Sequence, residues 1–126
     1  MKLHTSVTDG LLSITSYEVD RIAVNGRPLT KSFLLTPRRL IEDWPPDSFD
    51  SLTESDLLAV ARLDCPIVLL GTGARQRFPA PALLRPLIER RFGVEVMDSH
   101  AACRTFNILM AEGRDVAAAM IIESAG

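Results

Sequence analysis

The chain has few of the residues that metal centres and disulfide frameworks require, with two cysteines and two histidines among 126 residues. Cys65 and Cys103 stand far apart and form no Cys-x-x-Cys pair, and two histidines are too few for a zinc cluster. The sequence therefore predicts free thiols, no metal site and no bound cofactor, as expected for a cytoplasmic protein.

An excess of one charge is also missing, because 14 Lys and Arg residues nearly balance 16 Asp and Glu residues, for a formal net charge of −2. Nucleic acids and anionic membranes require a basic surface, so neither is expected as the main partner. The apolar runs are far too short to cross a bilayer. The opening residues, MKLHTSVTDG, show neither a signal peptide's apolar core nor an organelle-targeting pattern. We expect a cytoplasmic protein without a transmembrane segment.

What is present is the composition of a soluble globular chain, 47% hydrophobic and 24% charged, and its length predicts one domain over residues 1–126. The first part favours antiparallel strands over 11–19, 21–26 and 28–37, with Asn25-Gly26 as a tight hairpin turn. A Pro-rich connection follows, in which Trp44 is interpreted as a plug in the core or at its rim. The alternative is an exposed anchor for a partner protein.

From residue 53 the pattern changes to alternating helices and strands. Thr53 and Asp56 resemble a helix-capping pair, Ser99 is the expected cap of the best helix, and Gly113 is its expected end. The expected helices span 53–63, 80–92 and 99–113, and the expected strands span 66–71, 94–97 and 116–122. A hairpin region followed by a βαβαβ half predicts an α/β fold with a mixed central sheet and packed helices.

The stretch GTGARQRFP, residues 71–79, raises the question of a nucleotide site, because it follows a buried strand. The third glycine of a dinucleotide fingerprint is replaced by Gln76, and no Gly-Lys-Ser/Thr follows, so a P-loop is excluded. Two interpretations stay open. The glycines form a tight turn that needs positive φ, or they form one wall of a groove at the carboxyl end of the sheet, where Arg75 and Arg77 attract an anion.

The helix over 99–113 carries the remaining candidates. Asp98, His100 and Cys103 suggest a thiol nucleophile, although a structural thiol explains Cys103 equally simply and no catalytic residue is assigned. Asn107, with Thr105, is expected to tie down the glycine turn or to line the groove beside it. Arg38-Arg39 and Arg90-Arg91 are interpreted as solvated surface. The predicted groove residues are Gly71, Thr72, Gly73, Arg75, Asp98, Cys103, Arg104, Thr105 and Asn107.

The runs IVLLGTGARQRFP and GVEVMDSHAACRTFNILMAEGRDVAAAMI resemble a small uncharacterised domain family of bacteria and archaea. The same family includes the mitochondrial respiratory complex I assembly factor 3. The family's motifs match Gly71–Gly73, Asp98, Ala102 with Thr105 and Asn107, and Glu112–Arg114. The resemblance implies a three-layer α/β fold, no established catalytic activity, and a free-standing bacterial form of the domain.

Two functions follow from these observations. The first is a non-enzymatic binding or assembly protein whose partners are other proteins, with respiratory complex I suggested by the resemblance. The alternative is a small-molecule-binding protein or enzyme that uses the groove at Gly71–Gly73 and the start of the 99–113 helix. The absence of a recognisable acid/base pair or metal set favours the first. The sequence does not indicate whether copies of the chain associate.

Overall fold

The computed structural model describes residues 10–123, and the expectation about the opening residues falls largely outside this range. A small antiparallel sheet comes first, made of β1 (Ile14–Glu18), β2 (Arg21–Val24) and β3 (Arg27–Leu29). The main sheet contains β4 (Phe33–Leu35), β5 (Leu40–Ile41), β6 (Ile67–Gly71), β7 (Gly93–Met97) and β8 (Val116–Met120). The helices are α2 (Glu54–Ala61), α3 (Arg85–Glu89) and α4 (Ser99–Ala111), with 3-10 turns η1 (Phe49–Ser51) and η2 (Pro81–Leu84).

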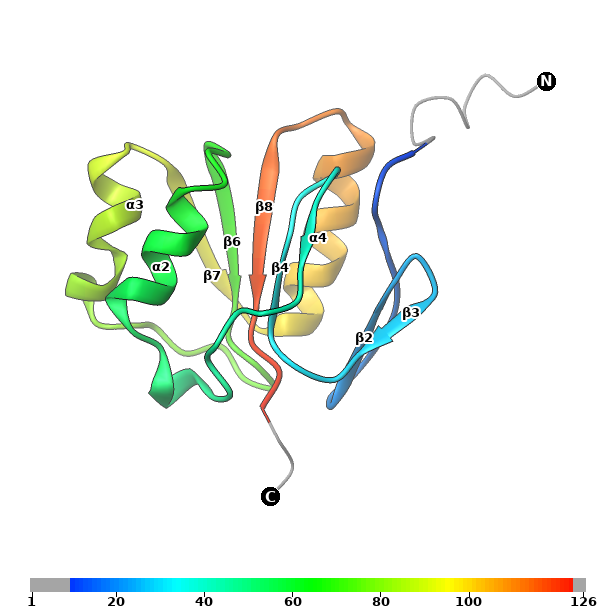
Figure 1. Cartoon of the computed structure of the whole chain (residues 1–126), viewed down its shortest axis with the longest axis horizontal. Helices are drawn as coiled ribbons and strands as arrows, with labels where there is room; N and C mark the ends of the chain where they lie inside the picture. Colours follow the sequence, from blue (N-terminus) through cyan, green and yellow to red (C-terminus); the bar gives the residue numbers. More distant parts are fainter. Residues whose placement is uncertain (1–9, 124–126) are drawn as a thin grey trace.

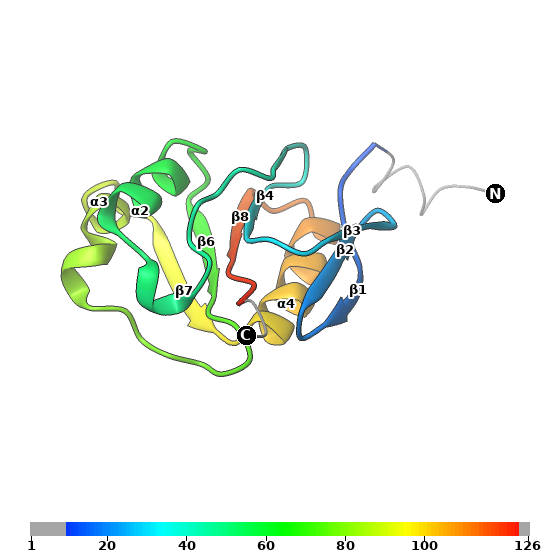
Figure 2. The same cartoon turned by 60° about the horizontal axis from the view of Figure 1, so that its bottom comes forward.

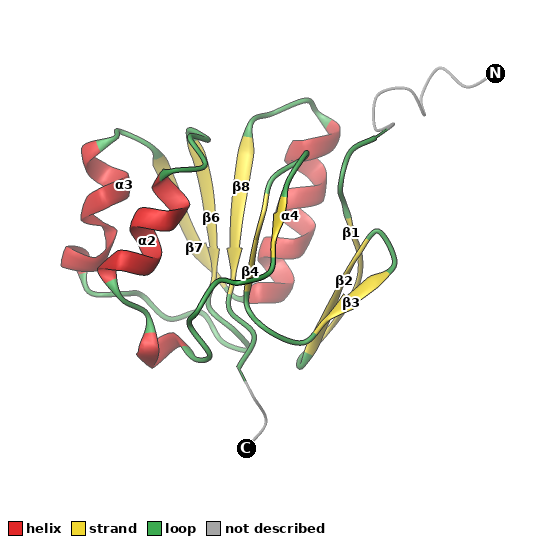
Figure 3. Cartoon of the chain, viewed as in Figure 1, coloured by secondary structure: helices red, strands yellow, loops and turns green. Residues whose placement is uncertain are grey.

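The main sheet is the middle layer, with strand order β5-β4-β8-β6-β7 (Figure 1). Strand β6 runs parallel to β7 and β8, whereas β4 runs antiparallel to β8, so the sheet is mixed. Helices α2 and α3 cover one face and α4 covers the other (Figure 3). The small sheet packs on α4 (Figure 2). The predicted α/β class, the mixed sheet and the three-layer arrangement are confirmed.

The core divides into two halves because successive strand residues point to opposite faces of the sheet. In β6, Leu69 packs on the α4 side, while Val68 and Leu70 pack toward α2 and α3. The alternation repeats in β4, where Leu35 joins the α4 side and Leu34 the other. Helices on both faces explain why these strands read as continuous apolar runs.

The strand predicted over 28–37 is wrong as one element, because it is two strands in two sheets. β3 ends at Leu29 and β4 begins at Phe33. Between them, the buried Ser32 accepts a hydrogen bond through Oγ from the backbone N–H of Ile122 at 2.9 Å. This contact directs the chain into the main sheet. The turn at Asn25-Gly26 is as predicted, with φ values of 49° and 84°.

Two helix predictions also need correction. The helix expected over 80–92 is divided into η2 and the short α3, because Pro86 lies in the first turn of α3 and has no N–H to continue a longer helix. The cap of α4 is Asp98, not Ser99: its Oδ1 accepts from the N–H of Ala101 at 2.9 Å. The Thr53–Asp56 capping box of α2 is confirmed, and Gly113 follows α4 at φ +79°.

Trp44 is a core residue, with 4% of its surface exposed. Its indole N–H donates to the carbonyl of Asp56 in α2 at 3.0 Å, so the polar atom of the buried indole has a hydrogen-bond partner. The prediction of a plug is confirmed, and the alternative of an exposed partner anchor is wrong.

Candidate functional site

The glycine turn at 71–73 has a structural explanation for each of its glycines. Gly73 has φ +98°, a backbone conformation that favours glycine. Gly71 is not in that region, but a Cβ there would lie 3.0 Å from Ser99 Oγ and 3.2 Å from the Cβ of Ala102. Its missing side chain therefore allows β6 and α4 to approach closely.

Thr72 and Ser99 hold this turn together from inside the protein. The buried Thr72 hydroxyl donates to the Arg75 carbonyl at 2.6 Å and accepts from the N–H of Arg77 at 3.2 Å. The buried Ser99 hydroxyl accepts from the N–H of Gly73 at 2.8 Å and donates to the Ile121 carbonyl at 3.1 Å. The N–H groups of Gly73 and Arg77 are therefore already bonded within the protein.

The carboxylates near the turn add to this picture. Glu123 lies against Gly73, where an added Cβ would meet Glu123 Oε1 at 2.8 Å, and its Oε2 accepts from the N–H of Phe49 at 2.9 Å. Asp98, half-buried, caps the helix that a phosphate would otherwise approach. Arg75 and Arg104 are exposed, and Thr105 is half-buried. The five main pockets in the described part of the chain are lined by none of the residues Arg75, Asp98, Arg104 and Thr105. Ligand binding at the turn stays a prediction.

Asn107 hydrogen-bonds to the backbone of another segment as expected, but that segment is β1 and not the glycine turn. Its Oδ1 accepts from the N–H of Ile14 and its Nδ2 donates to the carbonyl of the same residue, both at 2.8 Å. The amide thus acts as a strand partner for β1 and holds the small sheet on α4. The glycine turn is tied by Ser99 instead, because Asn107 lies two turns further along α4.

Cys103 is a buried thiol, 3% exposed. Burial, reinforced by the charge of Asp98, raises the pKa of Cys103 to about 12. Nearby, His100 stacks on Tyr17 with ring centroids 4.8 Å apart. A thiol of this pKa is protonated at neutral pH, which agrees with a structural role and disfavours the thiol nucleophile.

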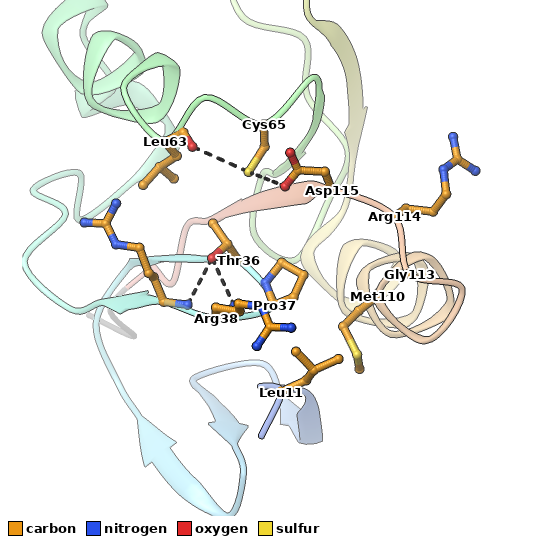
Figure 4. Close-up of a pocket in the computed structure, with 11 residues that line it drawn as sticks. Leu11, Thr36, Pro37, Arg38, Leu63, Cys65, Met110, Gly113, Arg114 and Asp115 are labelled. Atoms are coloured by element: carbon orange, nitrogen blue, oxygen red, sulfur yellow. Dashed lines mark hydrogen bonds between the residues drawn. The ribbon is translucent and has the colours of Figure 1, made fainter. Parts of the chain in front are cut away.

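The clearest candidate site lies at the opposite end of the sheet, at the amino ends of β6 and β8 (Figure 4). It is a half-open pocket of about 380 Å³, which we call the arginine pocket. Its lining comes from four separate segments and consists of Leu11, Thr36, Pro37, Arg38, Arg39, Leu63, Cys65, Met110, Gly113, Arg114 and Asp115.

The turn between β4 and β5 positions two of its cations. Thr36 Oγ1 accepts from the N–H groups of Arg38 at 3.2 Å and Arg39 at 3.0 Å, and the N–H of Thr36 donates to the Arg39 carbonyl at 2.8 Å. Within residues 10–123 neither arginine forms an ion pair. Arg114 differs, because it lies 3.8 Å from Glu112 and points away from the pocket's interior (Figure 4).

A thiol and a carboxyl form the opposite side of the pocket. The Cys65 Sγ–H donates to Asp115 Oδ1 at 3.3 Å (Figure 4). Burial raises the pKa of Cys65 to about 12, and the hydrogen bond to Asp115 and that carboxylate's charge act in the same direction. Arg39 opposes them and lowers this pKa, so its guanidinium acts electrostatically on the Cys65 side of the pocket.

This pocket was not predicted from the sequence. Arg38 and Arg39 were interpreted as solvated surface, and neither Cys65 nor Asp115 was predicted to line a site. The available signal was a pair of adjacent cations directly after Thr36-Pro37, a pattern typical of a turn. Which other segments meet that turn was not readable from local sequence.

A larger pocket, about 640 Å³, lies beside Trp44 and Pro46. Its rim carries Glu42, Asp43 and Asp47, but Glu42 pairs with Arg27 at 2.8 Å and Asp47 accepts from Ser51 at 3.2 Å. Two of the three carboxylates are thus already engaged. Among the described residues, no group of three His, Cys, Asp or Glu side chains is placed to hold a metal ion. No helix in that part of the chain is long and apolar enough to span a membrane.

Comparisons with known proteins identify relatives, similar structures and a family. The NADH dehydrogenase [ubiquinone] 1 alpha subcomplex assembly factor 3 of Bos taurus is 36% identical over 110 residues, covering 86% of this chain and 59% of that protein. The chain thus spans about three fifths of that relative's length. A crystal structure of a Bordetella parapertussis protein superposes with a TM-score of 0.85 at 37% identity, covering 90% of this chain and 98% of the other.

A solution structure of a Bordetella pertussis protein, described as a Mth938-like domain, gives a TM-score of 0.80 at 31% identity and covers 92% and 90% of the two chains. The model of a family described as "Protein of unknown function (DUF498/DUF598)" matches residues 14–121, from β1 to just beyond β8. The resemblance seen in the sequence is confirmed, and the chain belongs to the DUF498/DUF598 family.

Proposed function

We propose that this chain is a non-enzymatic protein-binding factor that takes part in the assembly of a respiratory NADH dehydrogenase. The observation that carries the proposal is the similarity to the Bos taurus assembly factor across 86% of the chain. The family model matches residues 14–121, which include both the small sheet and the main sheet. The proposed compartment is the cytoplasm.

Two features of the structure support a binding role over catalysis. Both thiols have a pKa raised to about 12, so neither supplies a thiolate nucleophile at neutral pH. The backbone amides of the glycine turn are used internally, by Ser99 for Gly73 and by Thr72 for Arg77. The two thiols and the N–H groups of Gly73 and Arg77 are therefore engaged in the fold and are not free for nucleophilic or phosphate chemistry.

Affinity capture tests the proposal. A tagged chain is expressed at native level in its own host, and proteins captured from membranes and from cytosol are identified by mass spectrometry. We expect subunits of NADH dehydrogenase or its assembly intermediates to be enriched over a tagged unrelated α/β domain. In a strain lacking the protein, native gels are expected to show less assembled NADH dehydrogenase. Unchanged assembly in that strain, together with capture of no such subunit, would contradict the proposal.

A further inference from the structure

We propose that the arginine pocket binds an acidic, apolar segment of a partner protein, with a carboxylate of that segment on Arg38 and Arg39. The inference rests on the proposed function and goes beyond it by naming a surface and the chemistry of the segment that fits it. It depends on the charge of the pocket, on the fixed backbone of the turn that carries that charge, and on the apolar surface beside it.

The charge of the pocket is unbalanced on the side of the β4–β5 turn. Arg38 and Arg39 are exposed and form no ion pair within residues 10–123, in contrast to Arg77 and Arg90, which each pair with an aspartate. The one carboxylate that lines the pocket, Asp115, accepts a hydrogen bond from Cys65 instead. A carboxylate of a partner protein would form ion pairs with these two unpaired guanidinium groups.

The backbone that carries these two arginines is fixed before any ligand arrives. The Thr36 hydroxyl holds the N–H groups of both Arg38 and Arg39, and the Leu12 N–H donates to the Pro37 carbonyl at 2.8 Å. The backbone of the turn is therefore bonded on two sides. A pre-organised backbone lowers the entropy lost on binding, because only the arginine side chains need to become ordered.

Apolar side chains line the pocket next to these cations. Leu11 and Leu63 are half-buried and Met110 is buried, and together with Pro37 they form the apolar part of the pocket lining (Figure 4). A free small anion would use the arginines and leave this surface bare. A peptide segment that alternates acidic and apolar residues uses both, and its charge complements the pocket.

The test uses the full chain, labelled with nitrogen-15, and follows its backbone amide signals during titration. The probe is the peptide acetyl-Leu-Glu-Leu-Asp-Leu-amide, and the matched neutral peptide is acetyl-Leu-Gln-Leu-Asn-Leu-amide. We expect saturable shifts at the amides of Thr36, Arg38, Arg39 and Asp115, with a dissociation constant of about 1 mM or lower for the acidic peptide. The neutral peptide is expected to bind at least roughly tenfold more weakly.

The variant Arg38→Glu/Arg39→Glu is expected to weaken binding of the acidic peptide by roughly tenfold or more. The control variant Arg85→Glu/Arg91→Glu makes the same change of charge at two exposed arginines, one in α3 and one just after it, and it is expected to bind like the wild type. The amide spectrum of each variant shows whether it is folded. Equal binding of both peptides, or an unchanged affinity in Arg38→Glu/Arg39→Glu, overturns the proposal.

Other ligands give different results. Inorganic phosphate that produces the same saturable shifts with equal or higher affinity would assign the pocket to a free anion and overturn the peptide proposal. Sedimentation with phosphatidylglycerol vesicles that is lost in Arg38→Glu/Arg39→Glu, without peptide binding, would assign it to a lipid surface.

The two proposals fail separately. Capture of NADH dehydrogenase subunits that persists in Arg38→Glu/Arg39→Glu would reject the pocket while leaving the assembly role intact. Peptide binding at the pocket without capture of any NADH dehydrogenase subunit would support the pocket and reject the assembly role.

Discussion

At the scale of single residues, Asn107 has the clearest individual role, because one amide bonds both backbone groups of Ile14. Replacing it with leucine keeps a similar volume but leaves the N–H and carbonyl of Ile14 without partners. Ile14 is buried, so water cannot fully replace these bonds.

We therefore expect Asn107→Leu to lower the free energy of unfolding by about 1–3 kcal/mol, measured by urea denaturation. The control is Ile108→Ala, the next residue on the same helix, whose side chain is 59% exposed and whose replacement should cost little. Equal stability of Asn107→Leu and the wild type would show that the contact to β1 contributes nothing.

The two thiols give a prediction about pH. Burial raises the pKa of both cysteines from 9.0 to about 12. In the folded chain, alkylation is therefore expected to be slow at neutral pH and to accelerate only as the pH approaches about 12, while in denaturant it should accelerate near 9.0. The measurement is the labelling rate against pH, with mass spectrometry to separate Cys65 from Cys103. Rapid labelling of native Cys103 alone near neutral pH would reverse the non-enzymatic interpretation.

The same pKa shifts link stability to alkaline pH. Below 9.0 both the folded and the unfolded thiols are neutral, so the stability contribution is fully present. Between 9.0 and about 12 the unfolded thiol ionises while the folded one stays protonated, so stability falls as the pH rises. The fall from about pH 8 to about pH 10 should be smaller in Cys103→Ala than in the wild type.

At the scale of secondary-structure elements, the junction of β6 and α4 depends on its glycines for two different reasons. Gly73→Ala places a side chain at φ +98°, and Gly71→Ala crowds Ser99 and Ala102. Each is expected to destabilise the fold by about 1 kcal/mol or more, measured as the shift in the urea midpoint. Gly93→Ala in β7 is the control, because the nearest atom to its added Cβ is 3.8 Å away. If all three variants behave alike, the turn has no special backbone requirement.

The same junction predicts that nucleotides do not bind. The N–H of Gly73 donates to Ser99, the N–H of Thr72 donates to the Met97 carbonyl, and Asp98 caps the helix with a carboxylate. A phosphate would have to break these bonds and approach a negative charge. Calorimetric titration with NAD, NADP or ATP at millimolar concentration should show no binding heat. A saturable heat that is changed by Asp98→Ala or Ser99→Ala would contradict this prediction and support a ligand-binding groove at this turn.

At the scale of the whole molecule, the small sheet and the main sheet share one apolar core. Ile22 and Val24 of the small sheet belong to the same buried cluster as Phe106 of α4 and Leu69 of the main sheet. Residues that share a core usually unfold together, so we predict one cooperative domain.

Hydrogen exchange tests this prediction amide by amide. Under conditions where exchange reports opening free energies, amides of Ile22 and Val24 should give values within about 1 kcal/mol of those of Val68 and Leu69. Trp44 fluorescence, which reports on the α2 side, should follow the same urea transition as far-UV circular dichroism. A small sheet that opens much more readily than the main sheet would show two units and would weaken the single-domain assignment.

The sequence by itself determined the features that depend on neighbouring residues. The capping box of Thr53 and Asp56, the turn at Asn25-Gly26 and the buried strand β6 follow from local chemistry and side-chain periodicity, and all three are present. The order of these elements was sufficient to predict the α/β class and the mixed sheet. The break of the dinucleotide fingerprint at Gln76 was also a local fact.

Only the tertiary structure decided which distant segments meet. The division of 28–37 between two sheets depends on Ser32 reaching Ile122, and the partner of Asn107 is Ile14, 93 positions away. The arginine pocket likewise joins Leu11, the turn at 36–39, Cys65 and Asp115. Local patterns fix how a segment folds and which of its faces is apolar, but many packings satisfy those patterns. The contacts that distinguish them form between residues far apart in the chain, where a single sequence carries no pairing signal.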